Sequence, residues 1–470
     1  MKLPIQDLQY LSMPLPEEVK MYHYAGDFEG EVACIDRWLA KTTLPHPLRR
    51  RLDIQRIFAT LLQNDYTMSA DEFLAGLKEK CPSATMATIE DFIAMGNVDF
   101  IHKGGERYFQ PQALRNLFNT HAGDIEKINN PDYIPPDRSQ ADLDTIHEMQ
   151  RAGHITYRYE VEEWMKLPPH ATREGETLRL WFPYPVACAT QPAEEIKLIS
   201  SSHPVTISGG THPTAYMEVP CKADETYSVT FSFVHKATYT DLSHHTPTGF
   251  PAGQGLTPDE LATYTAEQAP HIVFTPYIKA LAQEIKGDET DPLTIARAVY
   301  DWICTHVQYS YVRDYLLIEN IPEFVVTNGY GDCGTMALVF VTLCRALGIP
   351  AKWQSGSSCR PDSIGSHDWC MFYVAPYGWL YCDPSYGVGA ARGNNETRRL
   401  HYFGNLDPYR LVACDSFQNP LTPEKNTCRM DPYDNQSGEV EYADGGYFIF
   451  YGDREAGRRV VSAQRIFDHQ

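Results

Sequence analysis

Residues 331–340 read Gly-Asp-Cys-Gly-Thr-Met-Ala-Leu-Val-Phe, and the character of the chain changes at Cys333. The residues before Cys333 have no apolar periodicity and suit a tight turn. After it, apolar side chains recur at helical spacing, at Met336, Val339, Phe340, Leu343 and Leu347. Gly348 and Pro350 then stop the periodicity. The pattern predicts a helix with Cys333 at its N-terminus.

A cysteine at a helix N-terminus is suited to nucleophilic chemistry. Free backbone N–H groups and the helix dipole favour a thiolate, so we predict a lowered pKa for the Cys333 thiol. The same N–H groups can stabilise the oxyanion of a tetrahedral intermediate. The alternative is a buried, inert cysteine in a core helix, which is the commoner situation for a lone cysteine. Residues further along the chain favour the interpretation of Cys333 as a nucleophile.

Two β-rich runs supply these residues, with His367 at the start of the first and Asp383 at the end of the second. The runs span residues 367–374 and 379–383, and the Ala-Pro-Tyr-Gly segment between them predicts a hairpin. His367 and Asp383 would lie near the open end of this hairpin, within reach of an Asp–imidazole hydrogen bond. Alone, each is typical of an ordinary polar or turn residue. With Cys333, they supply a nucleophile, a base and an orienting carboxylate.

The segment from about Ile295 to Pro384 resembles the core of the transglutaminase-like superfamily, a branch of the papain-like thiol fold. Besides Gly-Asp-Cys, the matching pieces are Trp302-Ile303, Val307-Gln308-Tyr309, Leu343 to Ala351, His367-Asp368-Trp369, and Gly378-Trp379 through Asp383-Pro384-Ser385. The resemblance implies an α+β core in which a helix carrying the cysteine packs against an antiparallel sheet. It also implies that the three catalytic positions of the family are Cys333, His367 and Asp383.

Two features depart from the family pattern. Asp368 follows the histidine, where the family often has alanine. The family's upstream side-chain donor to the oxyanion has no clear match, and Tyr309 and Tyr311 are the candidates. These departures leave the substrate and the outcome of the reaction more open than the nucleophile.

The three site residues predict a thiol enzyme that acts on an amide of a peptide or protein substrate through a thioester. Cys333 attacks the carbonyl carbon, His367 protonates the leaving amine, and Asp383 orients His367. Transfer of the acyl group to water gives a protease or amidase, and transfer to an amine gives a transglutaminase; the sequence leaves both open. The alternative is a non-catalytic binding or scaffold protein that retains the fold. No cofactor or metal is expected, since the 12 cysteines include no C-x-x-C pair.

Composition and hydropathy limit the binding partners and the cellular location that we expect. The net charge of -21 argues against nucleic acid or an anionic membrane surface as a partner. The sequence has no apolar run of about 18 residues, so no membrane span is expected. The N-terminus has no apolar signal region, so we expect a cytoplasmic protein with reduced thiols. The oligomeric state is left open.

The length of 470 residues predicts about two to four domains. We assign a mainly helical domain to residues 1–128 and a β-sandwich-like module to 150–245. The transglutaminase-like core is assigned to 258–415, and strands that close this core to 416–470. A polar, proline-rich linker at 129–136 follows the first domain.

Within the helical domain, residues 98–109 predict a short hairpin that turns at Gly104-Gly105, as in a small winged module. No strongly basic recognition helix accompanies it, so DNA binding is not expected. Residues 387–395, rich in Gly and Asn, predict a loop beside the cleft. We expect the N-terminal units to restrict access to the thiol, because an open thiol site would act indiscriminately.

Overall fold

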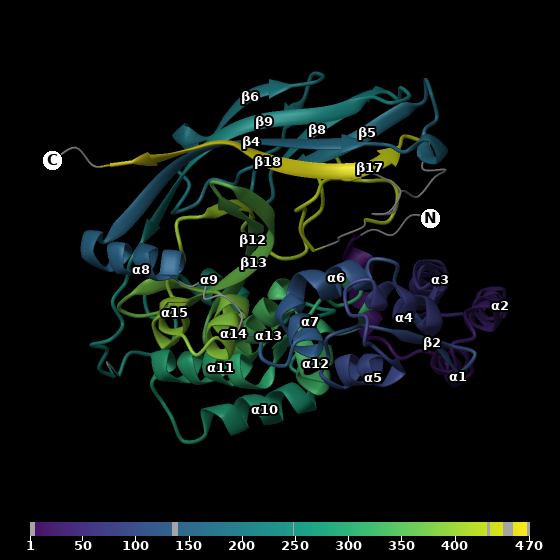
Figure 1. Cartoon of the computed structure of the whole chain (residues 1–470), viewed down its shortest axis with the longest axis horizontal. Coiled ribbons are helices and arrows are strands. Elements are labelled where there is room, and N and C mark those ends of the chain that lie inside the picture. Colours follow the sequence, from purple (N-terminus) through teal and green to yellow (C-terminus); the bar gives the residue numbers. More distant parts are fainter. Residues whose placement is uncertain (1–4, 134–139, 248, 430–432, 445–454, 468–470) are drawn as a thin grey trace.

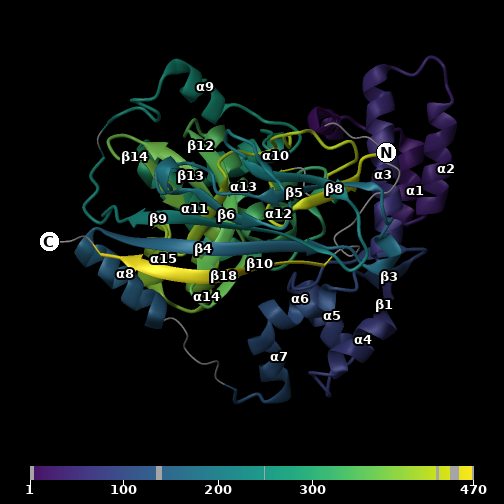
Figure 2. The ribbon, with the colours of Figure 1, turned by 90° about the horizontal axis from the view of Figure 1, so that it is seen from above.

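The computed structural model describes residues 5–133, 140–247, 249–429, 433–444 and 455–467. Figure 1 shows a β-rich layer above a layer of mixed helices and strands, with the N-terminal helices at one side. Figure 2 shows the same arrangement from above, with the long strands of the β-rich layer crossing over the core. The mixed α+β architecture is the one that the sequence motifs implied.

The core is a five-stranded antiparallel sheet that packs against helix α13 (Cys333–Ala346). The strand order is β15-β14-β13-β12-β16. The strands are β12 (Ala351–Arg360), β13 (Ser363–Val374), β14 (Gly378–Cys382), β15 (Phe403–Gly404) and β16 (Arg410–Cys414). The other helices of the core are α9 (Pro258–Thr265), α10 (Pro276–Lys286), α11 (Pro292–His306), η4 (Tyr315–Leu317), α12 (Ile321–Asn328), α14 (Pro384–Arg392) and α15 (Glu396–His401).

Helix α13 begins at Cys333, as the sequence predicted. Its N-cap is Asp332, whose side chain accepts from the Thr335 backbone N–H, while the Thr335 hydroxyl accepts from the Asp332 backbone N–H. Every residue from Cys333 to Arg345 is buried, so tertiary packing on all sides holds the helix in place. Gly348 follows with φ +77°, a conformation that glycine adopts without strain.

The predicted hairpin is confirmed as strands β13 and β14. The two strands pair antiparallel from Cys370 opposite Cys382 to Val374 opposite Gly378. A short parallel pair, β10 (Gln308–Tyr309) with β11 (Tyr330–Gly331), leads the chain into the start of α13. The hairpin and this pair therefore bring His367, Asp383 and Cys333 to one region of the core.

The β-rich layer consists of two four-stranded sheets that share one apolar core, as expected for a sandwich. One sheet is β17-β5-β8-β7 and the other is β18-β4-β9-β6. The strands are β4 (His154–Lys166), β5 (Thr177–Pro183), β6 (Lys197–Ser201), β7 (Thr206–Ile207), β8 (Thr214–Pro220), β9 (Thr226–Thr238), β17 (Glu439–Tyr442) and β18 (Glu455–Ile466). Helix α8 (Gln140–Ala152) precedes this layer, and the short helices η2 (Pro169–Ala171) and η3 (Ala193–Glu195) lie within it.

The C-terminal strands were expected to close the core, and this expectation is wrong. Strand β17 pairs with β5, and β18 pairs with β4 along nearly its whole length. Both therefore complete the β-sandwich. The physical reason is that β4 and β5 each have a sheet edge whose backbone groups need partners. Apart from this correction, the domain boundaries remain predictions.

The N-terminal region contributes to three apolar clusters, one of which consists of Leu15, Val19, Cys34, Ile35 and Leu52. Helix α3 (His46–Asp65) and η1 (Ile5–Ser12) share the cluster that contains α13, so this part does not pack as a separate unit. The predicted hairpin is present as β2 (Ile101–Lys103) and β3 (Glu106–Phe109), which form a sheet with β1 (Met68–Ser69). Phe109 belongs to a separate cluster, whereas Ile101 belongs to the cluster that contains α13. The remaining helices are α1 (Glu17–Ala25), α2 (Phe28–Leu39), α4 (Ala70–Lys78), α5 (Met86–Ala94), α6 (Ala113–Thr120) and α7 (Ala122–Asn129).

A second expectation that fails is the loop at residues 387–395. Residues up to Arg392 form helix α14, which starts at Pro384 with Asp383 as its N-cap. Gly387 is required there because a Cβ would overlap the Tyr300 side chain. Gly387 thus reflects close packing of α14 on α11 rather than a loop. Within the described ranges, no helix is both long and apolar enough to cross a membrane.

Candidate active site

The nucleophile candidate Cys333 is held at the first turn of α13. Its neighbour Asp332 accepts a hydrogen bond of 2.5 Å from the Tyr315 hydroxyl, which ties the start of the helix to η4. Gly334 is needed beside Cys333, because a Cβ there would lie 2.7 Å from Asp368 Oδ2 and would overlap the Tyr315 hydroxyl. The Gly-Asp-Cys-Gly motif thus leaves space for a crowded set of polar groups around the thiol.

His367 and Asp383 are brought together as the sequence predicted. His367 Nε2 lies 2.7 Å from Asp383 Oδ2, and both side chains are buried. The other carboxylate oxygen, Oδ1, accepts hydrogen bonds from the Tyr386 backbone N–H at 3.0 Å and the Ser385 hydroxyl at 2.9 Å. The N-terminus of α14 therefore fixes the orientation of the carboxylate, and Oδ2 faces the imidazole.

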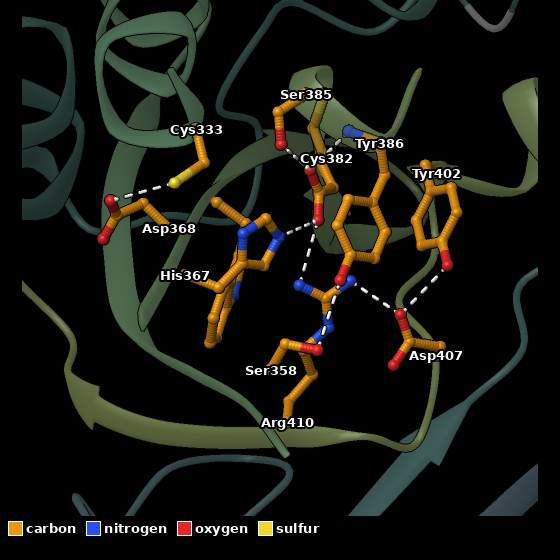
Figure 3. A network of polar contacts seen from close by, with 12 residues as sticks. Cys333, Ser358, His367, Asp368, Cys382, Ser385, Tyr386, Tyr402, Asp407 and Arg410 are labelled. Atoms are coloured by element: carbon orange, nitrogen blue, oxygen red, sulfur yellow. Dashed lines mark hydrogen bonds and ion pairs between the residues drawn. The ribbon is translucent and has the colours of Figure 1, made fainter. Parts of the chain in front are cut away.

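Arg410 is a member of this cluster that the sequence analysis missed. Its guanidinium is buried, 2.9 Å from Asp383 Oδ2 and 2.7 Å from Asp407 Oδ2. It lies over the ring of Trp369, and Figure 3 shows the rings of Tyr386 and Tyr402 beside it. Arg410 is on β16, which pairs with β12 rather than with the hairpin, so no local motif in the sequence points to it.

The electrostatics of the cluster keep Asp383 ionised. Burial acts to raise the pKa of Asp383, but His367 and Arg410 outweigh it, and the pKa falls to about 2. The Tyr386 ring stacks on the His367 imidazole with ring centroids 4.5 Å apart. His367 is thus held by a charged carboxylate on one edge and an aromatic face, an arrangement that fixes both its tautomer and its orientation.

The immediate partner of the thiol is Asp368. Cys333 Sγ donates to Asp368 Oδ2 at 3.5 Å, and Figure 3 shows the His367 ring between the thiol and the Arg410 guanidinium. The predicted lowering of the thiol pKa is not found. Burial, followed by the charges of Asp368 and Asp332, raises the pKa of Cys333 well above its usual value. Helix position alone could not predict this, because the carboxylates come from the turn before α13 and from β13.

A cleft of about 880 Å³ opens at Cys333 and is lined by all three parts of the molecule. The N-terminal region contributes Gln110, Gln112, Arg115 and Asn116; the β-sandwich contributes Glu163, Trp164, Phe182 and, from β18, residues 455–458. The aromatic candidates Tyr309 and Tyr311 also line it, beside Cys333. Burial raises the pKa of Tyr309 far enough that its phenol stays protonated, so it can donate a hydrogen bond. No cluster of His, Cys, Asp and Glu suited to a metal occurs in the described part of the chain.

A helix-borne thiol beside a hairpin-borne His–Asp pair is the arrangement typical of papain-like thiol proteins. Residues 279–384 match the family model of the transglutaminase-like superfamily, and the match includes Cys333, His367 and Asp383. The chain therefore contains a domain of the transglutaminase-like superfamily, as its motifs implied. The three residues remain candidates for catalysis.

Two curated relatives match part of the chain. An uncharacterized protein of Haemophilus influenzae is 27% identical over 163 residues, which cover 28% of this chain and 43% of that protein. The uncharacterized protein YebA of Bacillus subtilis is 22% identical over 129 residues, which cover 23% of this chain and 17% of that protein. The chain thus spans less than half the length of each of these relatives.

The solved structures that match the chain share less sequence identity with it. A protein of Cytophaga hutchinsonii, provisionally described as a cysteine protease, shares 14% identity, covers 67% of this chain and 90% of its own, and has a TM-score of 0.39. The periplasmic domain of TgpA from Pseudomonas aeruginosa shares 14% identity, covers 54% of this chain and 95% of its own, and has a TM-score of 0.28.

Proposed function

We propose that this chain is a thiol enzyme that forms a thioester between Cys333 and the acyl group of a peptide-like amide. The observation that carries the proposal is the 2.7 Å contact between His367 and Asp383 beside a cysteine that starts a helix. A buried, ionised carboxylate orients the imidazole and stabilises the imidazolium that forms when the imidazole takes up a proton during a reaction. The transglutaminase-like domain match supports the same chemistry.

In the first half of the reaction, the Cys333 proton passes to His367 and Sγ attacks the amide carbon. The oxyanion is placed near the N–H groups at the start of α13, and the Tyr309 phenol can add a further donor. The C–N bond breaks as His367 returns the proton to the leaving amine. Asp383 stabilises the imidazolium throughout, and the product is a thioester on Cys333. Water or an amine then takes the acyl group, and the thiol is regenerated.

The test uses an acyl donor that does not depend on the natural substrate. A p-nitrophenyl ester of a blocked amino acid should release one burst of p-nitrophenolate per chain, and mass spectrometry should find the acyl group on Cys333. Cys333→Ala should remove the burst, and His367→Ala should slow it by about 10³-fold. Cys188→Ala is the matched control, since Cys188 is partly exposed and outside the cleft. An undiminished burst in Cys333→Ala would refute the proposal.

A non-catalytic binding or scaffold role is the second candidate, and one observation favours it. The Cys333 thiol donates to Asp368, and burial with the nearby carboxylates raises its pKa, which reduces the thiolate at neutral pH. Treatment with one equivalent of a thiol reagent at about pH 7 separates the two candidates. Preferential modification of Cys333 supports the enzyme, whereas a Cys333 that stays unmodified after Cys188 has reacted supports the scaffold.

A further inference from the structure

Three arginine side chains line the cleft at Cys333, and they differ in their partners. Arg313 lies 2.8 Å from the Asp99 carboxylate, so the protein itself neutralises its charge. In the described part of the chain, Arg115 and Arg458 have no carboxylate within ion-pair distance. Acidic side chains outnumber Lys and Arg by 61 to 40, so a shortage of carboxylates does not explain this. The two arginines therefore leave positive charge available in the cleft.

Arg458 is fixed by contacts with the sheet that carries His367. Its Nη1 donates to the Ser357 hydroxyl at 2.6 Å, and its Nη2 donates to the Ser366 hydroxyl. The two serines lie opposite each other on β12 and β13, and Ser366 directly precedes His367. Both hydroxyls are neutral, so they position the guanidinium without cancelling its charge. A guanidinium has five N–H donors, and these two bonds leave others for a ligand.

Glu163 is the neighbour of Arg458 across the strand pair β4–β18, and it lines the same cleft. Glu163 is only 3% exposed, and its Oε1 has no hydrogen-bond partner within the described ranges. Burial, against the opposing effect of Arg458, raises the pKa of Glu163 to about 8, so the carboxyl is mostly protonated at neutral pH. A protonated carboxyl leaves the charge of Arg458 uncancelled and supplies an O–H donor beside it. A buried polar group without a partner is costly, and a ligand that accepts from this carboxyl removes that cost.

Arg115 supplies positive charge from another wall of the cleft. It is exposed on α6 of the N-terminal region, which Figure 1 shows beneath the β-rich layer that contains β18. Arg115 is close enough to Tyr311 to oppose the rise that burial causes in the pKa of that phenol. An anionic substrate that enters between α6 and β18 is therefore attracted from both sides.

We propose that Arg458, with the Glu163 carboxyl beside it, binds a carboxylate of the acyl donor, so that the chain selects acidic peptides. This inference rests on the proposed thiol chemistry and adds the class of substrate. The guanidinium and the protonated carboxyl both donate to the bound carboxylate. Because Arg458 is held by Ser366, next to His367, the carboxylate belongs to a residue near the reacting amide. An acidic side chain and a C-terminus supply the same group, and the experiment separates them.

The first measurement compares acyl donors that differ in charge. The full-length protein is acylated with the p-nitrophenyl ester of acetyl-glutamyl-glycine or of acetyl-glutaminyl-glycine, below saturation, and the rates of the p-nitrophenolate burst are compared. We expect the glutamyl ester to react about tenfold faster at low salt, because it gains a charge-assisted hydrogen bond. The preference should fall as salt is added. The acetyl-arginyl-glycine ester should be slower than both, and the proposal is overturned if this cationic ester reacts fastest.

Arg458→Gln should bring the ratio of the glutamyl and glutaminyl rates close to one. Arg459→Gln is the matched control, because Arg459 is the next residue on β18 and its guanidinium pairs with Glu162. It should keep the wild-type ratio. Each ratio is taken within one variant, so a loss of folded protein cancels, and the wild-type comparison needs no variant. A wild-type ratio in Arg458→Gln would refute the role of this arginine.

Glu163→Gln should also keep the preference for the glutamyl ester, since the amide donates in the same place without a charge. The substitution therefore separates a donor from a carboxylate that acts by its charge. If the preference disappears in Glu163→Gln, the donor role of Glu163 is wrong.

Binding without chemistry separates a failure of this proposal from a failure of the proposed function. Calorimetry with Cys333→Ala, in which the candidate nucleophile is absent, gives the Kd of three peptides. They are acetyl-glycyl-glutamyl-glycine amide, its glutaminyl counterpart, and the glutaminyl peptide with a free C-terminal carboxylate. At least one acidic peptide should bind about tenfold more tightly than the neutral one and lose this advantage when Arg458→Gln is added. The tighter acidic peptide identifies the source of the carboxylate.

If neither acidic peptide binds more tightly than the neutral one, the carboxylate site is refuted, even where Cys333 of the wild type is acylated. If an acidic peptide binds through Arg458 but no ester ever acylates Cys333, the proposed function fails and the carboxylate site stands.

Discussion

Arg410 lies 2.9 Å from Asp383, and both side chains are completely buried. The pair places a fixed positive charge behind the carboxylate that orients His367. Asp407 lies on the other side of the guanidinium, so one cation serves two buried carboxylates. The acid–base pair of the candidate site is therefore part of a charge network that extends into the contact between the core and the β-sandwich, where the Tyr159 hydroxyl donates to the Pro408 carbonyl.

Replacing Arg410 with Met should destabilise the protein by about 3–5 kcal/mol, because two buried carboxylates lose their cation. Urea unfolding at neutral pH measures the change in free energy. Arg459→Met is the control, since Arg459 is largely exposed and its pair with Glu162 is worth at most about 1 kcal/mol. Equal effects of the two changes would contradict the structural role given to Arg410.

Asp383→Asn should slow acylation of Cys333 by about 10³-fold or more, because an amide cannot stabilise the imidazolium and favours the wrong tautomer. The rate of the p-nitrophenolate burst is the measurement. A variant that folds normally and retains the wild-type rate would show that Asp383 does not orient a catalytic histidine.

The effect of Asp383→Asn on the stability of the fold should depend on pH. The pKa of Asp383 is about 2 in the folded chain against a usual 3.8, so its ionised form stabilises the fold above about pH 4 and this contribution is lost as the pH falls towards 2. The stability gap between wild type and Asp383→Asn should therefore be widest near neutral pH and should narrow in acid. Denaturant unfolding across that range tests it, and a gap that does not vary with pH would argue against a depressed pKa.

The contribution of Glu163 to the stability of the fold should have the opposite pH dependence. Burial raises its pKa to about 8, and one of its carboxylate oxygens has no hydrogen-bond partner in the described part of the chain. A group with a raised pKa stabilises the fold below its usual pKa of 4.5, and this stabilisation is lost as the pH rises through 8. Glu163→Gln should match the wild type at pH 4 and exceed its stability at pH 9 by at least about 1 kcal/mol. Glu162→Gln, on the other face of β4, should show no such crossover.

Gly334→Ala should destabilise the protein by about 1–3 kcal/mol and impair the thiol site, because a Cβ would press on Asp368 and the Tyr315 hydroxyl. Gly365→Ala is the control, since Gly365 lines the same cleft and a Cβ there would meet no atom within 4 Å. Thermal unfolding and the acylation burst are the measurements. Similar behaviour of the two variants would mean that the space beside Cys333 is not needed.

The sequence predicted the parts of the site that local signals specify. The position of Cys333 follows from a turn motif and apolar periodicity, and the His367–Asp383 contact follows from one short hairpin. Arg410 and the contact of Asp368 with the thiol could not be predicted, because they depend on strand register and on pairing with β16. Residues 387–395 were assigned to a loop from their composition, whereas residues up to Arg392 form a helix in which Gly387 allows close packing on α11. Strands β17 and β18 were assigned to the wrong sheet, because the residues of a strand do not specify which distant strand it pairs with.

The pairing of β18 with β4 also affects the order in which the molecule can be assembled. Most of the chain is synthesised between these two strands, and residues 455–458 of β18 form part of the wall above Cys333. A nascent chain on the ribosome therefore presents its thiol in an incomplete cleft until β18 has emerged and docked. The selectivity of the cleft is therefore acquired late, because one of its walls is missing until β18 has docked.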